Sequence, residues 1–338
     1  MASVIRKVLR AVAAVGSTSP ARIVPWLLIL AGFIASAGVP TSAGAADPAT
    51  RSSEHQLTVD GVKRTYYLHP PSKLDGSPVP LVIVFHGGQG DGLKIAGQTG
   101  FNQVADHRGF AVAYPNSLGY WNDGRATTTG GSGDDVAFVR ALIDHLVKTQ
   151  NVDRQRVYAT GASNGGMFTL RLACEMSDEI AAFAPVVASF PADYRAKCRP
   201  HRALPIMMVN GTSDTFIPWQ GGSIRKGLFR GAGGEVIPVP DTLEFWRQHN
   251  GCASEPSVRQ LPDIDKNDGT TAQLITYPNC REVVRMIRIE GGGHTWPGSE
   301  YAASGWIGHL VGKTNRDVNA SEAIWEFFKG QALEGFPR

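Results

Sequence analysis

Residues 156–172, RVYATGASNGGMFTLRL, join a strand pattern to a helix pattern through a glycine-rich turn. The turn contains Gly161, Ser163 and Gly165 in the spacing G-x-S-x-G. When a strand turns sharply into a helix at this motif, the serine hydroxyl is lifted clear of the sheet, and small neighbours let helix and strand approach closely. The motif therefore predicts Ser163 as a nucleophile. It also predicts the backbone N–H of Asn164, at the start of the helix, as one donor to an oxyanion.

Two chemically active side chains follow later strands of the predicted sheet. The apolar run 205–209 leads to Asp214, and the run 283–289 leads through three glycines to His294. The chain order Ser163, Asp214, His294 is that of the α/β-hydrolases and differs from the orders of chymotrypsin and subtilisin. An aspartate beside serine and threonine also forms local turns, and a lone histidine is commonly a structural group. We expect the three to form a catalytic triad because each follows the appropriate strand.

A glycine loop follows an early strand and predicts a second oxyanion donor. Residues 80–85 are continuously apolar, as in a parallel strand buried on both faces. His86 and two glycines come next, so that backbone N–H groups could face a substrate oxygen. The donor would be Gly88 or Gln89, and the alternative interpretation is an ordinary glycine turn.

The remaining pattern alternates strands with helices. An opening hairpin is expected at 56–60 and 63–68, a helix at 136–149 capped by the aspartates 134 and 135, and a last helix at about 320–329 with Asn319 as its N-cap. This rhythm predicts an α/β-hydrolase fold, a mostly parallel twisted sheet flanked by helices, as a single domain over residues 56–335 without a large lid. The glycine-rich stretch 220–240 is expected to be a mobile surface loop bordering the cleft.

The first 45 residues predict a secretory signal peptide. They carry four basic residues and no acidic ones, followed by an apolar core and small residues. The alternative is an uncleaved membrane anchor, but the core is shorter than the ~20 residues that a bilayer span needs. Without residues 1–45 the formal charge changes from +3 to −1, so no nucleic-acid partner is implied. We expect a flexible lead-in at 46–55 and a secreted or extracytoplasmic protein with no membrane attachment after cleavage.

The four cysteines are expected to form disulfides, since disulfides persist in the oxidising compartments that exported proteins reach. Of the three possible pairings we expect Cys174 with Cys198 and Cys252 with Cys280, because each bond would brace a segment leading to a triad residue. No metal-binding, dinucleotide-binding or phosphate-binding motif occurs in a supporting context, so neither a metal nor an organic cofactor is expected.

Several segments together resemble the exported polyhydroxybutyrate depolymerase and feruloyl esterase group of α/β-hydrolases, including its LpqC-like esterases. They are residues 84–88, 114–122, 161–167, 210–219 and 291–298. The resemblance covers most of residues 55–330 and implies the same triad. It also implies Trp121, Trp219 and Trp296 as candidates for the acyl or aromatic pocket. Many members of the group carry a cysteine where this chain has Gly88.

These patterns predict a serine esterase that works through an acyl-enzyme on Ser163. Its substrates would be poly(3-hydroxybutyrate)-type esters or feruloyl or acetyl esters of polysaccharides, and a site without a lid suits bulky or polymeric esters. One alternative is a serine peptidase, although peptidases with a similar elbow usually carry a large propeller domain. The other is a non-catalytic surface binding protein on a hydrolase scaffold, which would have no need of all three triad groups.

Overall fold

The computed structural model describes residues 52–71, 76–128, 133–226, 229–300 and 310–334. The predicted signal peptide and most of the predicted lead-in lie outside these ranges. The strands are β1 (Ser53–Val59), β2 (Val62–His69), β3 (Val79–Phe85), β4 (Ala111–Pro115), β5 (Val152–Ala162), β6 (Ala182–Val186), β7 (Ile206–Gly211), β8 (Gly222–Lys226), β9 (Phe229–Val236), β10 (Ser257–Gln260), β11 (Thr271–Thr276) and β12 (Val284–Glu290). The helices are α1 (Gly92–Thr99), α2 (Phe101–Arg108), α3 (Asp135–Thr149), α4 (Asn164–Glu175), α5 (Ala192–Arg195), α6 (Val239–His249) and α8 (Ala320–Phe328).

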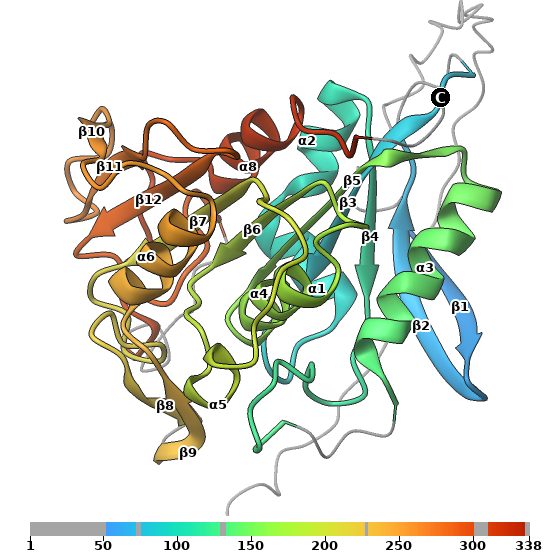
Figure 1. The fold of residues 1–338 in the computed structure, drawn as a ribbon, viewed down its shortest axis with the longest axis horizontal. Helices are drawn as coiled ribbons and strands as arrows, with labels where there is room; N and C mark the ends of the chain where they lie inside the picture. The colour runs from blue at the N-terminus through green and yellow to red at the C-terminus, as the bar shows by residue number, and fades with distance from the viewer. Residues whose placement is uncertain (1–51, 72–75, 129–132, 227–228, 301–309, 335–338) are drawn as a thin grey trace, which may run out of the picture. The chain divides into compact units, whose positions relative to one another are not determined.

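One large sheet organises the described part of the chain (Figure 1). Its strand order is β1-β2-β4-β3-β5-β6-β7-β12-β11-β10. The strands from β4 to β12 in this order run parallel, and antiparallel pairs extend the sheet at both edges. A mostly parallel sheet flanked by helices is the predicted α/β-hydrolase architecture, and that prediction is confirmed.

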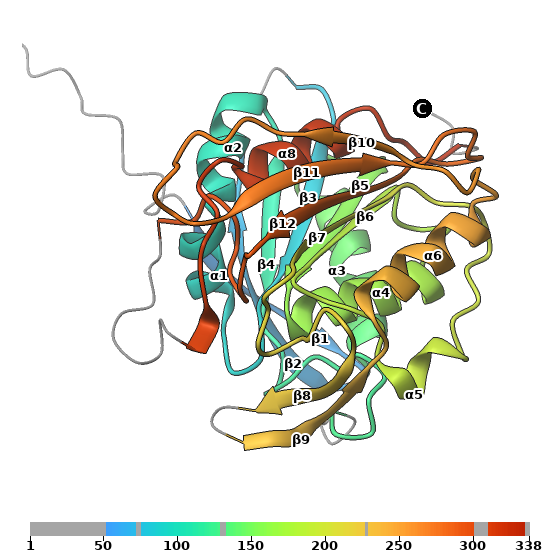
Figure 2. The same cartoon turned by 90° about the vertical axis from the view of Figure 1, so that its left-hand side faces the viewer.

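The central strand β3 is buried on both faces, as its continuous apolar run predicts. Leu81, Ile83 and Phe85 pack into the core on one face, and Val82 and Val84 pack into the core on the other. Helices α3, α4 and α6 cover the first face, and α1, α2 and α8 cover the second (Figures 1 and 2). A parallel sheet needs this double cover because neither of its faces is polar.

The sheet reverses its direction of growth beside β3. The chain passes from β3 through α1 and α2 to β4 on one side, and then through α3 to β5 on the other side. The last residue of β3, Phe85, pairs with Gly161 near the end of β5. The glycine loop after β3 and the turn after β5 are therefore neighbours. Open α/β sheets bind ligands in the crevice at such a reversal.

The predicted hairpin is present, with a turn at Asp60 and Gly61. Strand β1 begins at Ser53 rather than at the predicted Gln56, because Ser53 still pairs with Leu68 of β2. The residues just before the predicted start therefore belong to the sheet and not to a flexible lead-in.

Both helix caps lie where the sequence predicts them. Asp134 accepts hydrogen bonds from the first N–H groups of α3, and Asn319 accepts one from the N–H of Glu322 in α8. Asp135 does more than cap a helix. Its carboxylate accepts from the Arg64 guanidinium at 2.7 Å and from the Asn122 N–H at 2.8 Å, inside the protein. This aspartate fixes the loop that leads from β4 toward α3.

The stretch 220–240 differs from its prediction as a mobile surface loop. Strands β8 and β9 pair within it as an antiparallel hairpin. Ile224 and Val236 are buried in a small apolar cluster with Met167 and Ile217. These β-branched residues anchor a segment whose glycines suggested a loop, so the segment forms a β-hairpin with buried ends.

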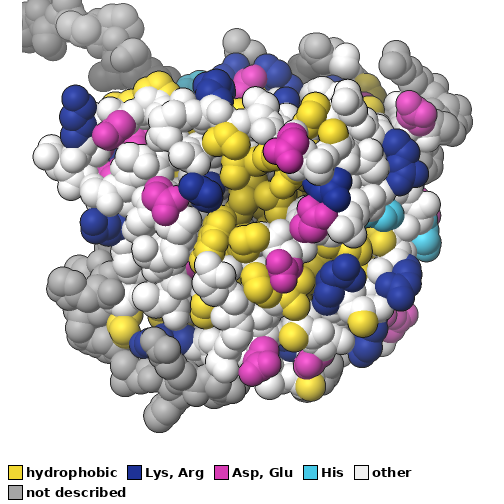
Figure 3. Space-filling view, turned by 60° about the vertical axis from the view of Figure 1, so that its left-hand side comes forward, with side chains coloured by type: hydrophobic (Ala, Val, Ile, Leu, Met, Phe, Trp, Pro, Cys, Tyr) yellow, Lys and Arg dark blue, Asp and Glu magenta, His cyan; other side chains and the backbone are white. Residues whose placement is uncertain are grey.

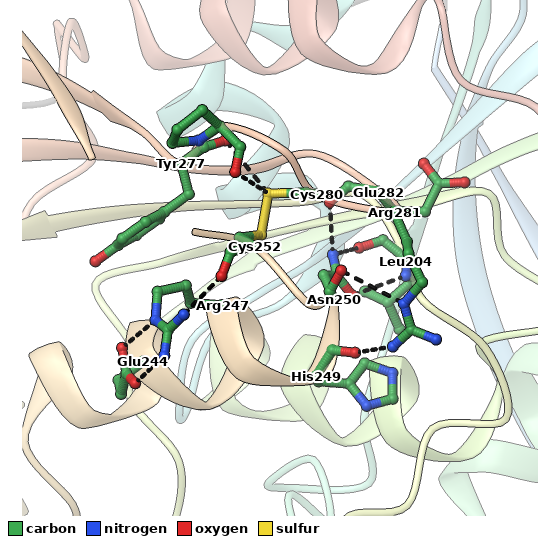
Figure 4. The surroundings of a disulfide bond; sticks show 11 residues. Leu204, Glu244, Arg247, His249, Asn250, Cys252, Tyr277, Cys280, Arg281 and Glu282 are labelled. Carbon is green, nitrogen blue, oxygen red and sulfur yellow. Dashed lines mark hydrogen bonds and ion pairs between the residues drawn. A yellow bond between two sulfur atoms is a disulfide. The ribbon is translucent and has the colours of Figure 1, made fainter. Parts of the chain in front are cut away.

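Both expected disulfides are present, Cys174–Cys198 and Cys252–Cys280. Figure 4 shows the second, which ties the end of α6 to the segment before β12. Around it, Arg247 donates to the Cys252 carbonyl at 2.7 Å, and Asn250 donates to the Glu282 carbonyl at 2.9 Å. Both sides of this bond are thus also held by hydrogen bonds.

Hydrophobic side chains reach the surface on one face of the molecule. Figure 3 shows them gathered in a hollow with acidic and basic side chains around it. No helix in the described ranges is long and apolar enough to cross a membrane.

We predict that replacing Cys252 and Cys280 together by alanine lowers the free energy of unfolding by about 3–4 kcal/mol, the loop-closure entropy expected for their separation of 28 residues. The alanine pair at Cys174 and Cys198, separated by 24 residues, should cost nearly the same. Urea unfolding would measure both, with the reduced wild-type protein as the control. An unchanged urea midpoint would contradict the prediction.

Candidate active site

Ser163 lies on a strained turn between β5 and α4. Its φ is 58° and its ψ is −119°, a conformation that costs a non-glycine residue of order 1–3 kcal/mol. The turn is held by the Ser163 N–H, which donates to the Val186 carbonyl of β6 at 3.0 Å. A Cβ on Gly166 would lie 2.7 Å from the same carbonyl, so helix and strand meet there without room for a side chain. The sequence motif predicts this geometry, and the fold supplies the bond that maintains it.

Asp214 and His294 meet beside this turn. The Nδ1 atom of His294 lies 2.7 Å from Oδ2 of Asp214, whose side chain is 1% exposed. The other carboxylate oxygen accepts from the N–H groups of Phe216 and Ile217, each at 2.8 Å. An ionised carboxylate only accepts, so His294 carries its proton on Nδ1 and leaves Nε2 able to accept another. The sequence left two interpretations of Asp214, a local turn and a contact with the histidine. The structure shows both, and they use different oxygens of the Asp214 carboxylate.

The face of the His294 imidazole is also held by a ring contact. The Phe216 ring stacks on it with centroids 5.0 Å apart and planes 25° from parallel. The N–H of the preceding Gly293 donates to the Lys313 carbonyl at 2.9 Å. Phe216 was missed from the sequence, although its place two residues after the aspartate could have suggested a contact with the site.

The predicted oxyanion loop forms a tight turn beside Ser163. The Gly90 N–H donates to the Gly87 carbonyl at 3.1 Å, and Gln89 has a φ of 61°. A Cβ on Gly88 would lie 2.5 Å from a ring carbon of Tyr120, so this ring occupies the space that any larger residue would need. The loop therefore exposes backbone rather than side chain at this point.

His86 holds this loop as a neutral imidazole. Its Nε2 accepts from the Ser117 N–H at 3.1 Å, so its proton is on Nδ1, which donates to the Gly87 carbonyl at 2.7 Å. Burial lowers the pKa of the His86 imidazole below its usual value of 6.5, and the bond to Gly87 offsets part of that effect. A second proton would remove the acceptor that Ser117 needs. The geometry of the loop thus depends on the neutral form.

Asn164, the residue after the candidate nucleophile, fixes a neighbouring loop with its side chain. Its Oδ1 accepts from the Trp121 N–H at 2.9 Å, and its Nδ2 donates to the Trp121 carbonyl at 2.9 Å. The same Nδ2 donates to a carboxylate oxygen of Asp123 at 2.7 Å. These three bonds hold the Asn164 side chain, and its backbone N–H lies at the start of α4.

Asp123 is linked to the β8–β9 hairpin through Arg125. It is completely buried and pairs with Arg125, whose Nη2 lies 2.6 Å from it. Thr128 adds a hydrogen bond of 2.9 Å to the same carboxylate, and Arg125 also donates to the Gly233 carbonyl in β9. The sequence did not reveal this network, because two charges two residues apart in a loop carry no local signal of burial.

These groups surround one cavity of about 920 Å³. Ser163, His294, Gly88 and Gln89 all line it. Further walls come from α1, the loop between β4 and α3, the β8–β9 hairpin and the segment 311–316. The stretch that contains the hairpin was expected to border the cleft, whereas the segment 311–316 was not predicted to form the site. They come from parts of the chain far from the motifs.

The three tryptophans suggested for the pocket have different places. Trp296 lines the cavity and donates to the Ser321 hydroxyl at 3.1 Å. Trp121 is completely buried, stacks on Phe168 with centroids 5.1 Å apart, and does not line the cavity. Trp219 packs against the core and is also absent from the cavity wall. Of the three, Trp296 is the one that lines this cavity.

Within the described ranges, no three His, Cys, Asp or Glu side chains are placed to hold a metal ion.

Comparison with known proteins identifies the family of the chain. Residues 62–191 match the family described as Esterase PHB depolymerase. The protein named Putative esterase NocK, from Nocardia uniformis subsp. tsuyamanensis, is 31% identical over 296 residues, which cover 84% of each chain. The chain belongs to the Esterase PHB depolymerase family. Feruloyl esterase B of Neurospora crassa is 32% identical to this esterase over 251 residues, 69% of this chain and 84% of that one.

A solved structure supports the fold of this esterase. The acetyl xylan esterase from Aspergillus awamori matches it with a TM-score of 0.52 at 18% identity, over 72% of this chain and 94% of that chain. Membership of the family makes the protein a hydrolase of carboxylic esters.

We predict that His86 makes stability depend on pH. Its folded-state pKa is lowered, so the unfolded chain binds more protons as the pH falls below about 6.5, and the folded state loses stability there. The His86→Gln variant lacks this titration and should lose less stability than the wild type between pH 7.5 and pH 5. Urea unfolding at both pH values would show this, with exposed His201→Gln as the control. Equal losses in wild type and His86→Gln would contradict it.

We predict that Asp123→Asn costs about 3–5 kcal/mol of stability, because it leaves Arg125 buried without a counter-charge. The double variant Asp123→Asn with Arg125→Met should cost less than the sum of the single changes. A double-mutant cycle by urea unfolding measures the difference. As a control, Glu322→Gln at the partly exposed Arg108–Glu322 pair should cost under about 1 kcal/mol. Additive single effects would contradict the proposed coupling.

Proposed function

We propose that this esterase hydrolyses its substrates through an acyl-enzyme, with Ser163 as nucleophile, His294 as general base and Asp214 as the group that orients His294. The observation that carries this proposal is the 2.7 Å contact between His294 Nδ1 and Asp214, in the wall of the cavity that Ser163 also lines. This contact directs the proton-accepting Nε2 away from Asp214. Such a histidine can activate a serine hydroxyl within reach.

The reaction then proceeds in two balanced steps. In the first, the Ser163 oxygen bonds to the acyl carbon, its proton moves to His294, and the histidine gives that proton to the departing alcohol oxygen. In the second, a water oxygen bonds to the acyl carbon and gives a proton to His294, the bond between the acyl carbon and the Ser163 oxygen breaks, and His294 returns the proton to that oxygen. The products are the alcohol and the carboxylic acid.

Negative charge on the substrate oxygen would be stabilised by backbone N–H groups. The Asn164 N–H belongs to the first turn of α4, where N–H groups lack acceptors within the helix and the helix dipole is positive. Gln89 or Gly88 would supply the second donor from the turn that His86 holds. Losing one such donor typically costs about 10²- to 10³-fold in kcat.

The substrate class we propose is a poly(3-hydroxybutyrate)-type ester or a feruloyl or acetyl ester of a polysaccharide. The family description and the named relatives support this range. The cavity of about 920 Å³ falls within the usual range for organic ligands.

We also propose that the protein works outside the cytoplasm. Two disulfides support this, since such bonds form and persist in oxidising compartments. The expected signal peptide at residues 1–45 is the means of export in this proposal.

We predict that Ser163→Ala lowers turnover by about 10³-fold or more on every ester that the wild type cleaves, leaving only background. Purified proteins would be compared on acetyl, butyryl and feruloyl esters and on hydroxybutyrate polymer films. Ser257→Ala, on the exposed strand β10, is the control and should match the wild type. Equal rates in wild type and Ser163→Ala would overturn the proposed mechanism, and cleavage of peptide amides in preference to esters would favour a peptidase.

A further inference from the structure

Most charged groups around the cavity are already paired with other parts of the protein. Lys94 lies 2.9 Å from Asp91, and Arg125 is neutralised by the buried Asp123. The cavity is lined by these charged side chains: Asp91, Lys94, Arg125, Arg225, Asp265, Asp268, Lys313 and Arg316. The partners of each decide which charge is left for a ligand.

The charged residues between 265 and 316 that line the cavity are paired as well. Arg316 lies 3.6 Å from Asp265, and its backbone N–H donates to Asp268 at 2.8 Å. Lys313 donates to the Gly269 carbonyl at 3.1 Å. The two negative and two positive charges of these residues therefore nearly balance.

Arg225 differs from the other cations of the cavity. Among the described residues, its guanidinium has no ion pair and no hydrogen bond. Its Nε is shielded from water and has no acceptor. An uncompensated charge in a partly buried position costs free energy that a ligand of opposite charge can recover.

The backbone links Arg225 to the histidine through Phe216. Its N–H donates to the Phe216 carbonyl at 3.2 Å, and the Phe216 ring is the one that stacks on His294. In an acyl transfer, the histidine hands its proton to the departing alcohol, so the alcohol half of the ester lies on this side of the cavity. Arg225 therefore belongs to the part of the site that would hold the alcohol half.

We propose that Arg225 binds a carboxylate on the alcohol half of the substrate. The preferred esters are then those of hydroxy acids whose own carboxyl group is free, such as the carboxyl-terminal end of a short linear oligomer of a hydroxy acid. Arginine suits this task because its planar guanidinium stays charged and pairs with carboxylates through two hydrogen bonds. This inference rests on the proposed esterase mechanism and adds a substrate class to it.

The substrate class also agrees with the fixed hairpin. Arg225 lies in β8, and the Arg125 bond to Gly233 ties the neighbouring strand β9 to the loop beside Ser163. This contact restrains the backbone of the hairpin relative to the nucleophile turn. Such an arrangement favours substrates in which a set number of bonds separates the carboxylate from the cleaved ester.

The test compares two substrates that differ only in charge: the linear dimer of 3-hydroxybutyrate and its terminal carboxamide. We predict that the wild type cleaves the acid with the higher kcat/KM, and that Arg225→Gln lowers this value roughly 10- to 100-fold for the acid while changing it under about 2-fold for the carboxamide. For the acid, the kcat/KM of Arg225→Lys should lie between those of the wild type and Arg225→Gln. Arg259→Gln, on exposed β10, removes the same charge and should change neither. Equal cleavage of the two substrates by the wild type, or equal losses on both in Arg225→Gln, would overturn the proposal.

A binding experiment separates this proposal from the catalytic one. Calorimetry with 3-hydroxybutyrate and with its amide on Ser163→Ala does not require turnover. Binding of the acid but not the amide, abolished by adding Arg225→Gln, would support the carboxylate site even if Ser163 were not the nucleophile. Binding unaffected by Arg225→Gln would overturn it while leaving the role of Ser163 intact. A weaker binding of the acid at high salt is expected for a charge pair.

Discussion

The strained turn at Ser163 is the constraint on which the site depends. The turn places the hydroxyl above the sheet only while β5, β6 and α4 remain in close contact, and the bond from the Ser163 N–H to Val186 maintains that contact. The pairing of Phe85 with Gly161 then brings the loop after β3 to the same point. Strain of this kind persists only where the surrounding structure over-determines it. Here the central strands of the sheet do so, and β3 and β6 are buried along their whole length.

The electrostatics of the site follow from pairing rather than from net charge. Asp214 and Asp123 are both buried, and each has both of its carboxylate oxygens occupied by hydrogen-bond donors. His86 is also buried and remains neutral. Buried pairs of this sort add little net stability compared with an apolar core, but removing one partner is costly. They therefore fix positions, which is what a site assembled from distant segments requires.

Sequence reasoning succeeded where a feature depends on neighbours in the chain. The strand before Ser163, the caps at Asp134 and Asn319 and the two disulfide pairings could all be predicted. It failed where distant contacts decide the outcome. Trp121 stands next to site residues in the sequence, yet its ring is part of the core. The hairpin at 222–236 is rich in glycine but is held by buried residues at its ends and by Arg125, which no local pattern connects to it.

The path from Asn164 through Asp123 and Arg125 to Gly233 makes the nucleophile turn and the hairpin wall one connected unit. A wall carried by a separate mobile lid would have to be ordered each time a ligand binds, and that ordering would weaken affinity. A wall tied to the nucleophile by buried bonds is ordered beforehand. It can also discriminate between substrates by distance, because the wall and the nucleophile cannot move apart without breaking one of these buried contacts. Selectivity in this fold then depends on a loop network two steps removed from the reacting atoms.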